Sequence, residues 1–334
     1  MALQCLLIAD DLTGACDAAV HFASRGLQVN VARNGPEPAD VIAISTESRD
    51  SGLASFLTAL QPWRDFPAPI LFKKIDSTLR GNVGTEVVAA MVAFACDLAV
   101  VTPAFPAMGR VVVNGYLQLV HESDFMPREV AGCFRGLDAP VALRDALCDD
   151  DLDAIVAEGR NRPERILWAG SAGLAAALAR TLGTAAPPVL PFVPGAPIFC
   201  LGSNHAVTME QQARLLQLRA AALCSADSAS ALPSGLAVVR IRRGHTPAAR
   251  VRQLLRGAAR PLVLCGGDTA ALVCSALDVR AIDLRREIAP GIPCGLLVGG
   301  PFDGLPVATK SGGFGSPDAL IEVADFFTCP QPLP

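Results

Sequence analysis

Residues 3–25 read LQCLLIADDLTGACDAAVHFASR, a pattern that much of the chain repeats. The mostly apolar run Leu3–Ala9 has the composition of a buried β-strand. Two carboxylates, Asp10 and Asp11, follow it directly, and a helix-like, alanine-rich segment covers Gly14–Arg25. This order is typical of a parallel strand whose carboxyl end leads into a helix.

Strand-like and helix-like segments alternate through most of the chain. In the amino-terminal half they are Leu3–Ala9, Gly14–Arg25, Gln28–Ala32, Val41–Ser45, Leu53–Leu60, Ile70–Lys74, Gly84–Ala95, Leu98–Thr102, Ile166–Ala169 and a helix from Gly170 to Leu182. In the other half they are Ile198–Leu201, His205–Arg219, Ala237–Ile241, Ala248–Ala259, Leu262–Cys265, Thr269–Leu277, Ile282–Leu284, Gly295–Val298 and Asp318–Phe327. The alternation predicts an α/β fold with mainly parallel sheets and helices on their faces.

A proline-rich tract divides the two halves. Five prolines lie between residues 184 and 197, where they prevent a continuous helix and favour an extended connection. We therefore expect two α/β domains, covering residues 1–190 and 197–334. Ligands of such sheets gather at the carboxyl ends of strands, and we expect the active site in the cleft between the domains.

The composition excludes several classes of protein. The 334 residues are 51% hydrophobic with a formal net charge of −4 and no long run of like charge, which disfavours nucleic-acid and membrane-surface partners. No apolar stretch approaches the ~20 residues of a membrane helix, and Asp10 and Asp11 come too early for a signal peptide, so we expect a cytoplasmic protein. Eleven cysteines without a Cys-x-x-Cys pair indicate buried thiols, and the four scattered histidines disfavour zinc.

The segment Lys73–Gly81, KKIDSTLRG, places dense polar chemistry directly after an apolar strand. Arg80 can hold a carboxylate bidentately, and Lys73 or Lys74 supplies a compact positive charge. Sugar hydroxyls can bind to the side chains of Asp76, Ser77 and Thr78. The segment therefore indicates a site for a small polyhydroxylated anion, whereas the alternative is an ordinary connection in which Asp76 or Ser77 caps a helix.

Other strand ends carry matching groups. Asp10 and Asp11 repel each other unless a cation or a ligand lies nearby, and they can hold a substrate hydroxyl, accept its proton or approach hydrated Mg²⁺. The alternative is a plain helix cap by Asp11 or Thr13. Arg49 and Arg110 also follow strand-like runs and could join Arg80 around an acid substrate.

The second half contains three glycine-marked turns. They are Leu201-Gly202-Ser203-Asn204, Cys265-Gly266-Gly267-Asp268-Thr269 and Lys310-Ser311-Gly312-Gly313-Phe314-Gly315. Glycine lets backbone N–H groups approach phosphate oxygens, and a following helix adds its dipole, so the turns favour a nucleotide phosphate. Neither the P-loop motif nor a Gly-x-Gly-x-x-Gly opening a helix after the first strand occurs, which disfavours P-loop kinases and ordinary dinucleotide dehydrogenases.

Six ordered blocks resemble the four-carbon acid sugar kinase family, formerly a domain of unknown function. They are residues 8–15, the Lys73–Gly81 run, residues 103–106, residues 170–174, residues 266–270 and the Lys310–Gly315 run, which together span nearly the whole chain. The resemblance implies an acid-sugar-binding domain followed by an ATP-binding domain, and phosphorylation of the 4-hydroxyl of threonate, erythronate or an oxo-tetronate.

The resemblance also implies roles for single residues. Asp11, Arg49 and the Lys74–Thr78 segment should contact the sugar acid, with Asp10 and Arg80 beside them. The ATP contacts should come from Ser203, Gly266, Gly267, Asp268, Thr269 and the glycines Gly312, Gly313 and Gly315. Compared with the family pattern, the chain is compressed between Gly115 and Arg135 and between Arg219 and Pro261.

The expected reaction is in-line phosphoryl transfer from MgATP, in which positioning and charge stabilisation supply most of the catalysis. Asp11 or Asp268 would accept the proton or contact Mg²⁺, and Lys310 would stabilise charge on the phosphoryl group; no set of metal ligands can be named. Two alternatives remain: a non-catalytic sensor of an acid sugar and a nucleotide, and a nicotinamide-dependent acid-sugar dehydrogenase. The oligomeric state is open, a homo-oligomer included.

Overall fold

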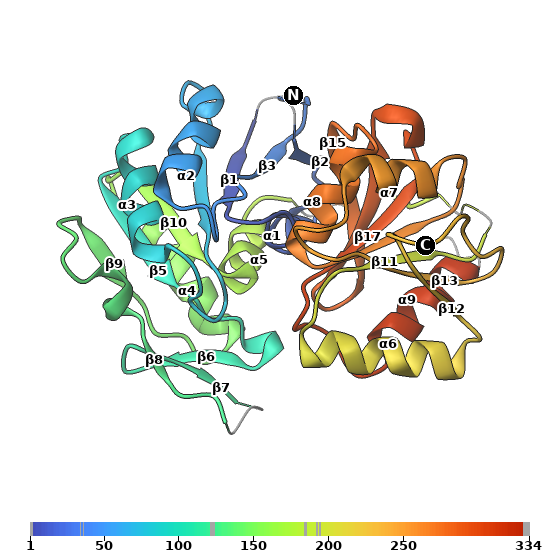
Figure 1. Ribbon diagram of the computed structural model, residues 1–334. Helices are drawn as coiled ribbons and strands as arrows, with labels where there is room; N and C mark the ends of the chain where they lie inside the picture. The colour runs from blue at the N-terminus through green and yellow to red at the C-terminus, as the bar shows by residue number, and fades with distance from the viewer. Residues whose placement is uncertain are drawn as a thin grey trace. The chain divides into compact units, whose positions relative to one another are not determined.

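The protein is described by a computed structural model that covers residues 3–33, 35, 37–120, 124–183, 186–191, 193 and 195–329 (Figure 1). The chain forms two compact units: unit 1 comprises Met1–Val31 and Gly35–Ala186, and unit 2 comprises Ala32–Asn34 and Pro187–Pro334. Residues 184, 185, 192 and 194 of the proline-rich tract lie outside the described residues. Among the helices that are described, none has the length and hydropathy of a membrane span.

Unit 1 is built on a sheet with the strand order β2-β3-β1-β4-β10-β5-β9. Its strands are β1 (Cys5–Ala9), β2 (Val29–Ala32), β3 (Val41–Ser45), β4 (Ile70–Lys74), β5 (Leu98–Thr102), β9 (Val141–Leu143) and β10 (Ile166–Gly170). All neighbours from β3 to β9 are parallel. The strand order reverses at β1, because β3 lies on one side of it and β4 on the other. Such a switch point opens a crevice at the carboxyl ends of the two diverging strands.

Helices cover both faces of this sheet (Figure 1). They are α1 (Leu12–Ala23), α2 (Leu53–Leu60), α3 (Val83–Ala93), α4 (Asp149–Arg160) and α5 (Ala172–Arg180). Helices α1, α5 and α4 pack side by side on one face of the sheet, and helices α2 and α3 pack against each other on the opposite face. The core between these layers is closed by large apolar side chains such as Phe22, Phe56 and Phe72, which are fully buried.

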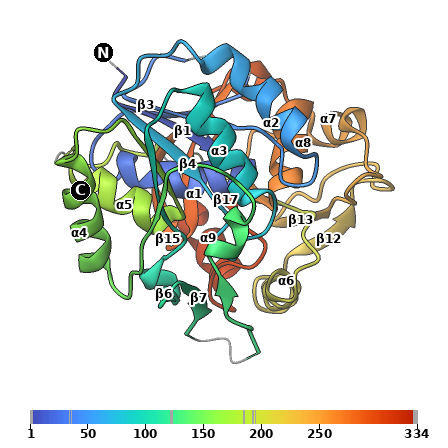
Figure 2. The same cartoon turned by 90° about the vertical axis from the view of Figure 1, so that its left-hand side faces the viewer.

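A separate small sheet extends from the main sheet of unit 1, as the turned view shows (Figure 2). It contains the antiparallel strands β6 (Arg110–Val113), β7 (Tyr116–Leu119) and β8 (Arg128–Glu129). The hairpin between β6 and β7 turns at Asn114 and Gly115, both of which have positive φ. This sheet and helix α4 were not predicted from the sequence.

Unit 2 has the strand order β12-β13-β11-β14-β17-β16-β15. Its strands are β11 (Ile198–Leu201), β12 (Ala222–Ser225), β13 (Ala237–Arg240), β14 (Leu262–Cys265), β15 (Ala281–Ala289), β16 (Ile292–Val298) and β17 (Pro306–Lys310). The strands from β12 to β17 are parallel, and β16 is antiparallel to both β17 and β15. The order reverses at β11, so unit 2 has a switch point between β11 and β14.

The helices of unit 2 also lie on both faces of its sheet (Figure 1). They are α6 (Ala206–Leu218), α7 (Ala248–Leu255), α8 (Gly267–Ala276) and α9 (Ala319–Thr328). Helix α6 packs on α9 and α7 packs on α8, and Phe199, Leu215 and Phe327 belong to the core beneath α6 and α9. The predicted α/β class with mostly parallel strands is thus confirmed.

Candidate functional site

The first cluster of polar groups begins where β1 ends and α1 starts. Asp11 is the N-cap of α1: its backbone is extended, and its Oδ1 accepts a 2.6 Å hydrogen bond from the Gly14 amide. A Cβ at Gly14 would lie 2.6 Å from Asp11 Oδ1, so this close cap requires glycine. Asp11 therefore caps the helix, as one of the two sequence interpretations had it, whereas Asp10 takes no part in the cap.

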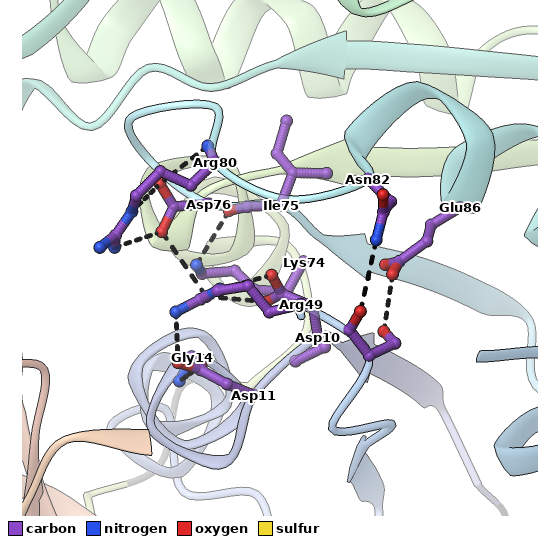
Figure 3. A network of polar contacts seen from close by, with 12 residues as sticks. Asp10, Asp11, Gly14, Arg49, Lys74, Ile75, Asp76, Arg80, Asn82 and Glu86 are labelled. Atoms are coloured by element: carbon purple, nitrogen blue, oxygen red, sulfur yellow. Dashed lines mark hydrogen bonds and ion pairs between the residues drawn. The ribbon is translucent and has the colours of Figure 1, made fainter. Parts of the chain in front are cut away.

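Arg49, from the loop after β3, binds three carboxylates. Its Nε and Nη2 donate to the two oxygens of Asp10 at 2.8 and 2.9 Å, and its Nη1 donates to Asp11 Oδ2 at 2.6 Å. Asp76 Oδ2 lies 3.5 Å from Arg49 Nη2. Figure 3 shows these side chains pointing toward one another. They meet because the register pairs Ala9 with Ser45 and Ile8 with Lys73, which brings three strand ends to one edge.

The segment after β4 folds around the Asp76 carboxylate. Its Oδ1 accepts from the Thr78 amide at 3.0 Å, Thr78 Oγ1 at 2.6 Å and Arg80 Nε at 3.0 Å, and its Oδ2 accepts from Arg80 Nη2 at 2.6 Å. Asp76 does not cap a helix, since α3 begins at Val83 with Asn82 as its N-cap. The Arg80 side chain is 58% exposed. Ser77 is buried in the same turn.

The two adjacent lysines have different surroundings. Lys73 Nζ lies 2.8 Å from Glu86 Oε2, and the two side chains are only 1% and 2% exposed. Lys74 Nζ donates to the Ile75 carbonyl at 2.9 Å and lies 3.6 Å from the position of a Cβ on Gly14. Lys74 is therefore the lysine of the polar cluster, as Figure 3 shows, while Lys73 is part of the core.

The carboxylates of the cluster differ in proton affinity. Burial raises the pKa of Asp11, and it raises that of Asp17, one helical turn after Gly14 on α1, to about 6. Burial would also raise the pKa of Asp10, but the charges of Arg49, Lys73 and Lys74 outweigh it and lower that pKa. Likewise, the bonds from Arg80 outweigh burial and lower the pKa of Asp76. The cluster thus combines ionised acceptors with carboxyl groups that favour a proton.

Together these groups form the acid-sugar candidate site: Asp10, Asp11, Arg49, Lys74, Asp76, Thr78 and Arg80. All were predicted from the sequence, and unit 1 brings them together at its switch point. Arg110, also predicted, lies buried at the start of β6, donates to the Met108 carbonyl at 3.1 Å, and its charge acts on the neighbouring Asp17 carboxyl. The sequence analysis did not single out Asp17 and Glu86. Each is an acidic residue in an otherwise apolar helix, and this pattern could have drawn attention to them.

The second cluster lies in unit 2, where the three glycine turns meet. The register pairs Leu201 with Cys265 and Cys265 with Lys310, so all three turns leave the same edge of the sheet. The Gly266 amide donates to the Lys310 carbonyl at 2.9 Å. A Cβ at Gly312 would lie 2.3 Å from Ser203 Oγ, and one at Gly202 would lie 2.1 Å from Thr269 Oγ1. Glycine is therefore required for the turns to approach one another.

This arrangement places the predicted nucleotide residues together. Gly266, at φ +101, precedes α8, and Gly267, Asp268 and Thr269 form its first turn, where unpaired amides and the helix dipole attract anions. Gly313 approaches the His205 ring, and Gly315 has φ +89. We call Ser203, Gly266–Thr269 and Gly312–Gly315 the glycine-turn site.

Lys310 is bonded to the last of the three glycine turns. It is fully buried, and its Nζ donates to the carbonyls of Ser311 at 2.8 Å, Gly312 at 3.3 Å and Phe314 at 2.8 Å. An ammonium group has three N–H donors, and three loop carbonyls accept from it. Burial lowers its pKa. In the structure Lys310 anchors the last glycine turn, and the role of its charge in stabilising a phosphoryl group stays a prediction.

Asp268 is exposed and forms an ion pair with Arg243, whose Nε lies 2.7 Å from Asp268 Oδ2. Arg243 was not predicted, although the cationic run Arg240-Ile241-Arg242-Arg243 after a strand was a signal for it. Within the described residues, no group of three or more His, Cys, Asp or Glu side chains is placed to hold a metal ion.

Comparison with known proteins identifies two domain families in the chain. A sugar-binding N-terminal domain matches residues 5–133 and a nucleotide-binding C-terminal domain matches residues 240–320. The chain is 32% identical over 397 aligned positions to a D-threonate kinase of Bordetella bronchiseptica, covering 95% of this chain and 96% of that protein. A D-threonate kinase of Salmonella typhimurium is 30% identical, with coverage of 96% and 97%, and a 3-oxo-tetronate kinase of Pseudomonas fluorescens is 28% identical, with coverage of 93% and 94%.

A solved structure of a Salmonella typhimurium protein described as a putative tRNA synthase has a TM-score of 0.74, with 97% of this chain and 99% of that one covered. At 21% identity, this likeness shows the fold alone. The sequence relatives and the two domain matches go further: the chain belongs to the four-carbon acid sugar kinase family of ATP-dependent phosphotransferases.

Proposed function

We propose that this protein transfers the γ-phosphoryl group of ATP to the 4-hydroxyl of a four-carbon acid sugar, with D-threonate as the first candidate. The observation that carries the proposal is the convergence of three carboxylates and three cations at the switch point of unit 1. D-threonate is placed first because both relatives reported at 30% identity or more are named D-threonate kinases.

In this proposal, the acid-sugar candidate site recognises both ends of its ligand. The half-exposed Arg80 guanidinium and the Lys74 ammonium would hold the sugar carboxylate, since a planar fork matches a carboxylate bidentately. Asp10, Asp76 and Thr78 would bind the hydroxyl groups. Arg49 would keep the carboxylates in place by balancing their charge.

The glycine-turn site would hold the ATP phosphates through backbone amides and Ser203. Mg²⁺ in kinase sites is bound mainly by phosphates and one or two carboxylates, so no preformed set of protein ligands is needed. Asp268, exposed in the first turn of α8, fits an ion that arrives with the nucleotide. When bound, such an ion neutralises charge on the phosphates.

Asp11 is the proposed proton acceptor. The sugar O4 would attack the γ-phosphorus, the bond to the bridging oxygen of ADP would break, and the O4 proton would pass to the Asp11 carboxylate. A buried carboxyl with a raised pKa accepts a proton more readily than an exposed one. Transfer requires both ligands in one active site, so the proposal includes closure of the two domains about the linker.

A coupled ADP-release assay tests this function on D-threonate, D-erythronate and 3-oxo-tetronate, with the position of the phosphate in the product read by NMR. We expect turnover with one of these acids and a 4-phosphate product. Asp11→Asn should lower kcat about 100-fold or more while ATP binding is retained.

Ligand-induced stabilisation without any ADP release by pure, ATP-binding protein would contradict the proposal and favour the sensor. Loss of ATP binding in Asp11→Asn would contradict the placement of Asp11 in the acid-sugar candidate site.

A further inference from the structure

Most cationic side chains around the glycine-turn site are bonded to other groups of the protein. Lys310 is bound by three loop carbonyls. Arg240 donates to the Ser203 carbonyl at 3.2 Å and to Asn204 Oδ1 at 2.7 Å, so it supports the first turn. Arg242 pairs with Asp227 at 2.6 Å. These side chains shape the site, but a phosphate chain that carries several negative charges also needs a cation that can reach it.

Arg243 has the position and the exposure for that task. Its Nε lies 2.7 Å from Asp268 Oδ2 in the first turn of α8, and the two side chains are 62% and 56% exposed. An ion pair this exposed contributes little to stability and can be exchanged at low cost. Displacing Lys310, by contrast, would release the whole Gly312–Phe314 turn.

The backbone that carries Arg243 is firmly held. It follows β13, which neighbours β11 at the switch point. The Thr246 amide donates to the Arg242 carbonyl at 2.9 Å, and Thr246 Oγ1 donates to Asp227 Oδ1 at 2.8 Å. Arg243 therefore extends an exposed side chain from a fixed turn, next to the glycine turns.

We propose that Arg243 is a phosphate-binding residue, which exchanges the Asp268 carboxylate for phosphate oxygens when ATP binds. This inference rests on the proposed nucleotide site. The planar guanidinium matches phosphate as well as carboxylate, so the same group can serve both partners. A carboxylate in the first turn of α8 repels phosphates, and the guanidinium beside it offsets that repulsion when it binds them. The Asp268 carboxylate, once released, would be available to a metal ion bound with the phosphates.

A purely structural ion pair makes a different prediction. If Arg243 and Asp268 only hold two loops together, removing either partner weakens nucleotide binding alike. If they exchange partners, removing Arg243 weakens binding of metal-free ATP, whereas removing the Asp268 charge leaves it unchanged or makes it tighter. The direction in which Asp268→Asn changes the affinity for metal-free ATP therefore distinguishes a structural ion pair from an exchange of partners.

The test is calorimetric titration with ATP, with and without Mg²⁺, and with adenosine. Arg243→Ala should bind ATP about ten- to a hundredfold more weakly, as expected for a lost charge-assisted hydrogen bond, and adenosine within twofold of the wild type. Asp268→Asn in EDTA should bind ATP at least as tightly as the wild type.

The matched control is Arg252→Ala, which breaks an exposed pair of the same unit, Arg252 Nη2 with Asp278 Oδ1 at 2.7 Å, and should change neither affinity. Three results would overturn this inference but not the proposed function. They are normal ATP binding by Arg243→Ala, a loss of adenosine binding by Arg243→Ala as large as its loss of ATP binding, and a loss of ATP binding by Asp268→Asn that matches that of Arg243→Ala. If the wild-type protein binds neither adenosine nor ATP, the proposed function and this inference are both overturned.

Discussion

At the scale of single residues, four carboxyl groups of unit 1 differ because their partners differ. Asp10 and Asp76 each accept two bonds from an arginine. Asp11 accepts from one arginine nitrogen and from a helix amide. Asp17 is buried on α1, and its Oδ1 has no hydrogen-bond partner among the described residues. A buried carboxyl without full compensation favours its neutral form.

Asp17 should make stability depend on pH. Its pKa of about 6 lies above the ordinary 3.8, so the folded state holds its proton more tightly than the unfolded state does. The resulting stabilisation is complete below pH 4 and is lost as the pH rises to about 6. Asp17→Asn removes this dependence, and its unfolding free energy relative to the wild type should rise by about 1–2 kcal/mol from pH 5 to pH 7.5.

Urea denaturation at both pH values measures the effect. Asp65→Asn, which replaces an exposed carboxylate of unit 1, is the control and should give the same difference at both. A difference for Asp17→Asn that does not change with pH would mean that the carboxyl group titrates normally.

Sequence reasoning found residues that stand in polar runs beside apolar strands. Asp10, Asp11, Lys74, Asp76 and Arg80 were predicted for this reason. Their mutual contacts could not be predicted, because Arg49 reaches them only through the strand register.

The surroundings of Lys310 could not be predicted either. It ends β17, a strand that the sequence did not reveal, and the fold buries it.

At the scale of elements, the loop that carries Arg49 is fixed by a buried ion pair between β4 and α3. Glu86 Oε2 lies 2.8 Å from Lys73 Nζ, and Glu86 Oε1 accepts from Ser48 Oγ at 2.6 Å. The Ser48 amide in turn donates to the Asp10 carbonyl at 3.0 Å. Glu86 thus connects α3 to the turn that aims Arg49 at the carboxylates.

Removing one partner of this pair should be more harmful than removing both. Glu86→Leu leaves the Lys73 ammonium buried without its counterion, and we expect a loss of about 3–5 kcal/mol of unfolding free energy. Lys73→Met with Glu86→Leu replaces the pair by apolar groups and should recover most of that loss. Chemical denaturation of both variants tests this.

Asp325→Leu, which breaks the exposed pair of Arg219 and Asp325, should change stability little. A double variant no more stable than Glu86→Leu would show that Lys73 does not require its counterion.

The elements that the sequence missed share a cause. Strand β17, Pro306–Lys310, begins with a proline and ends with Thr309 and Lys310, and helix α4 begins with three aspartates; in both, these residues weaken the apolar pattern. Long apolar runs next to turn residues were found, because burial in a parallel sheet leaves a strong pattern.

At the scale of the whole molecule, the two units share one structural feature. Each has a parallel sheet with a switch point, and each gathers its polar residues at the carboxyl ends of the diverging strands. The predicted sugar-binding and nucleotide-binding halves are confirmed by the domain matches. The grouping of Ala32–Asn34 with unit 2 had no signal in the sequence, since only three-dimensional contacts define it.

The central claim is that the acid sugar binds at the switch point of unit 1 and ATP at the glycine turns of unit 2. Calorimetric titration of D-threonate and ATP into Arg49→Lys and Gly312→Ala tests it most directly. Gly235→Ala is the control, because a Cβ there meets no atom within 4 Å, whereas one at Gly312 would lie 2.3 Å from Ser203 Oγ. We expect Arg49→Lys to weaken D-threonate binding at least about tenfold and to leave ATP binding unchanged, and Gly312→Ala to do the reverse. Loss of ATP binding in Arg49→Lys, or of D-threonate binding alone in Gly312→Ala, would contradict the account.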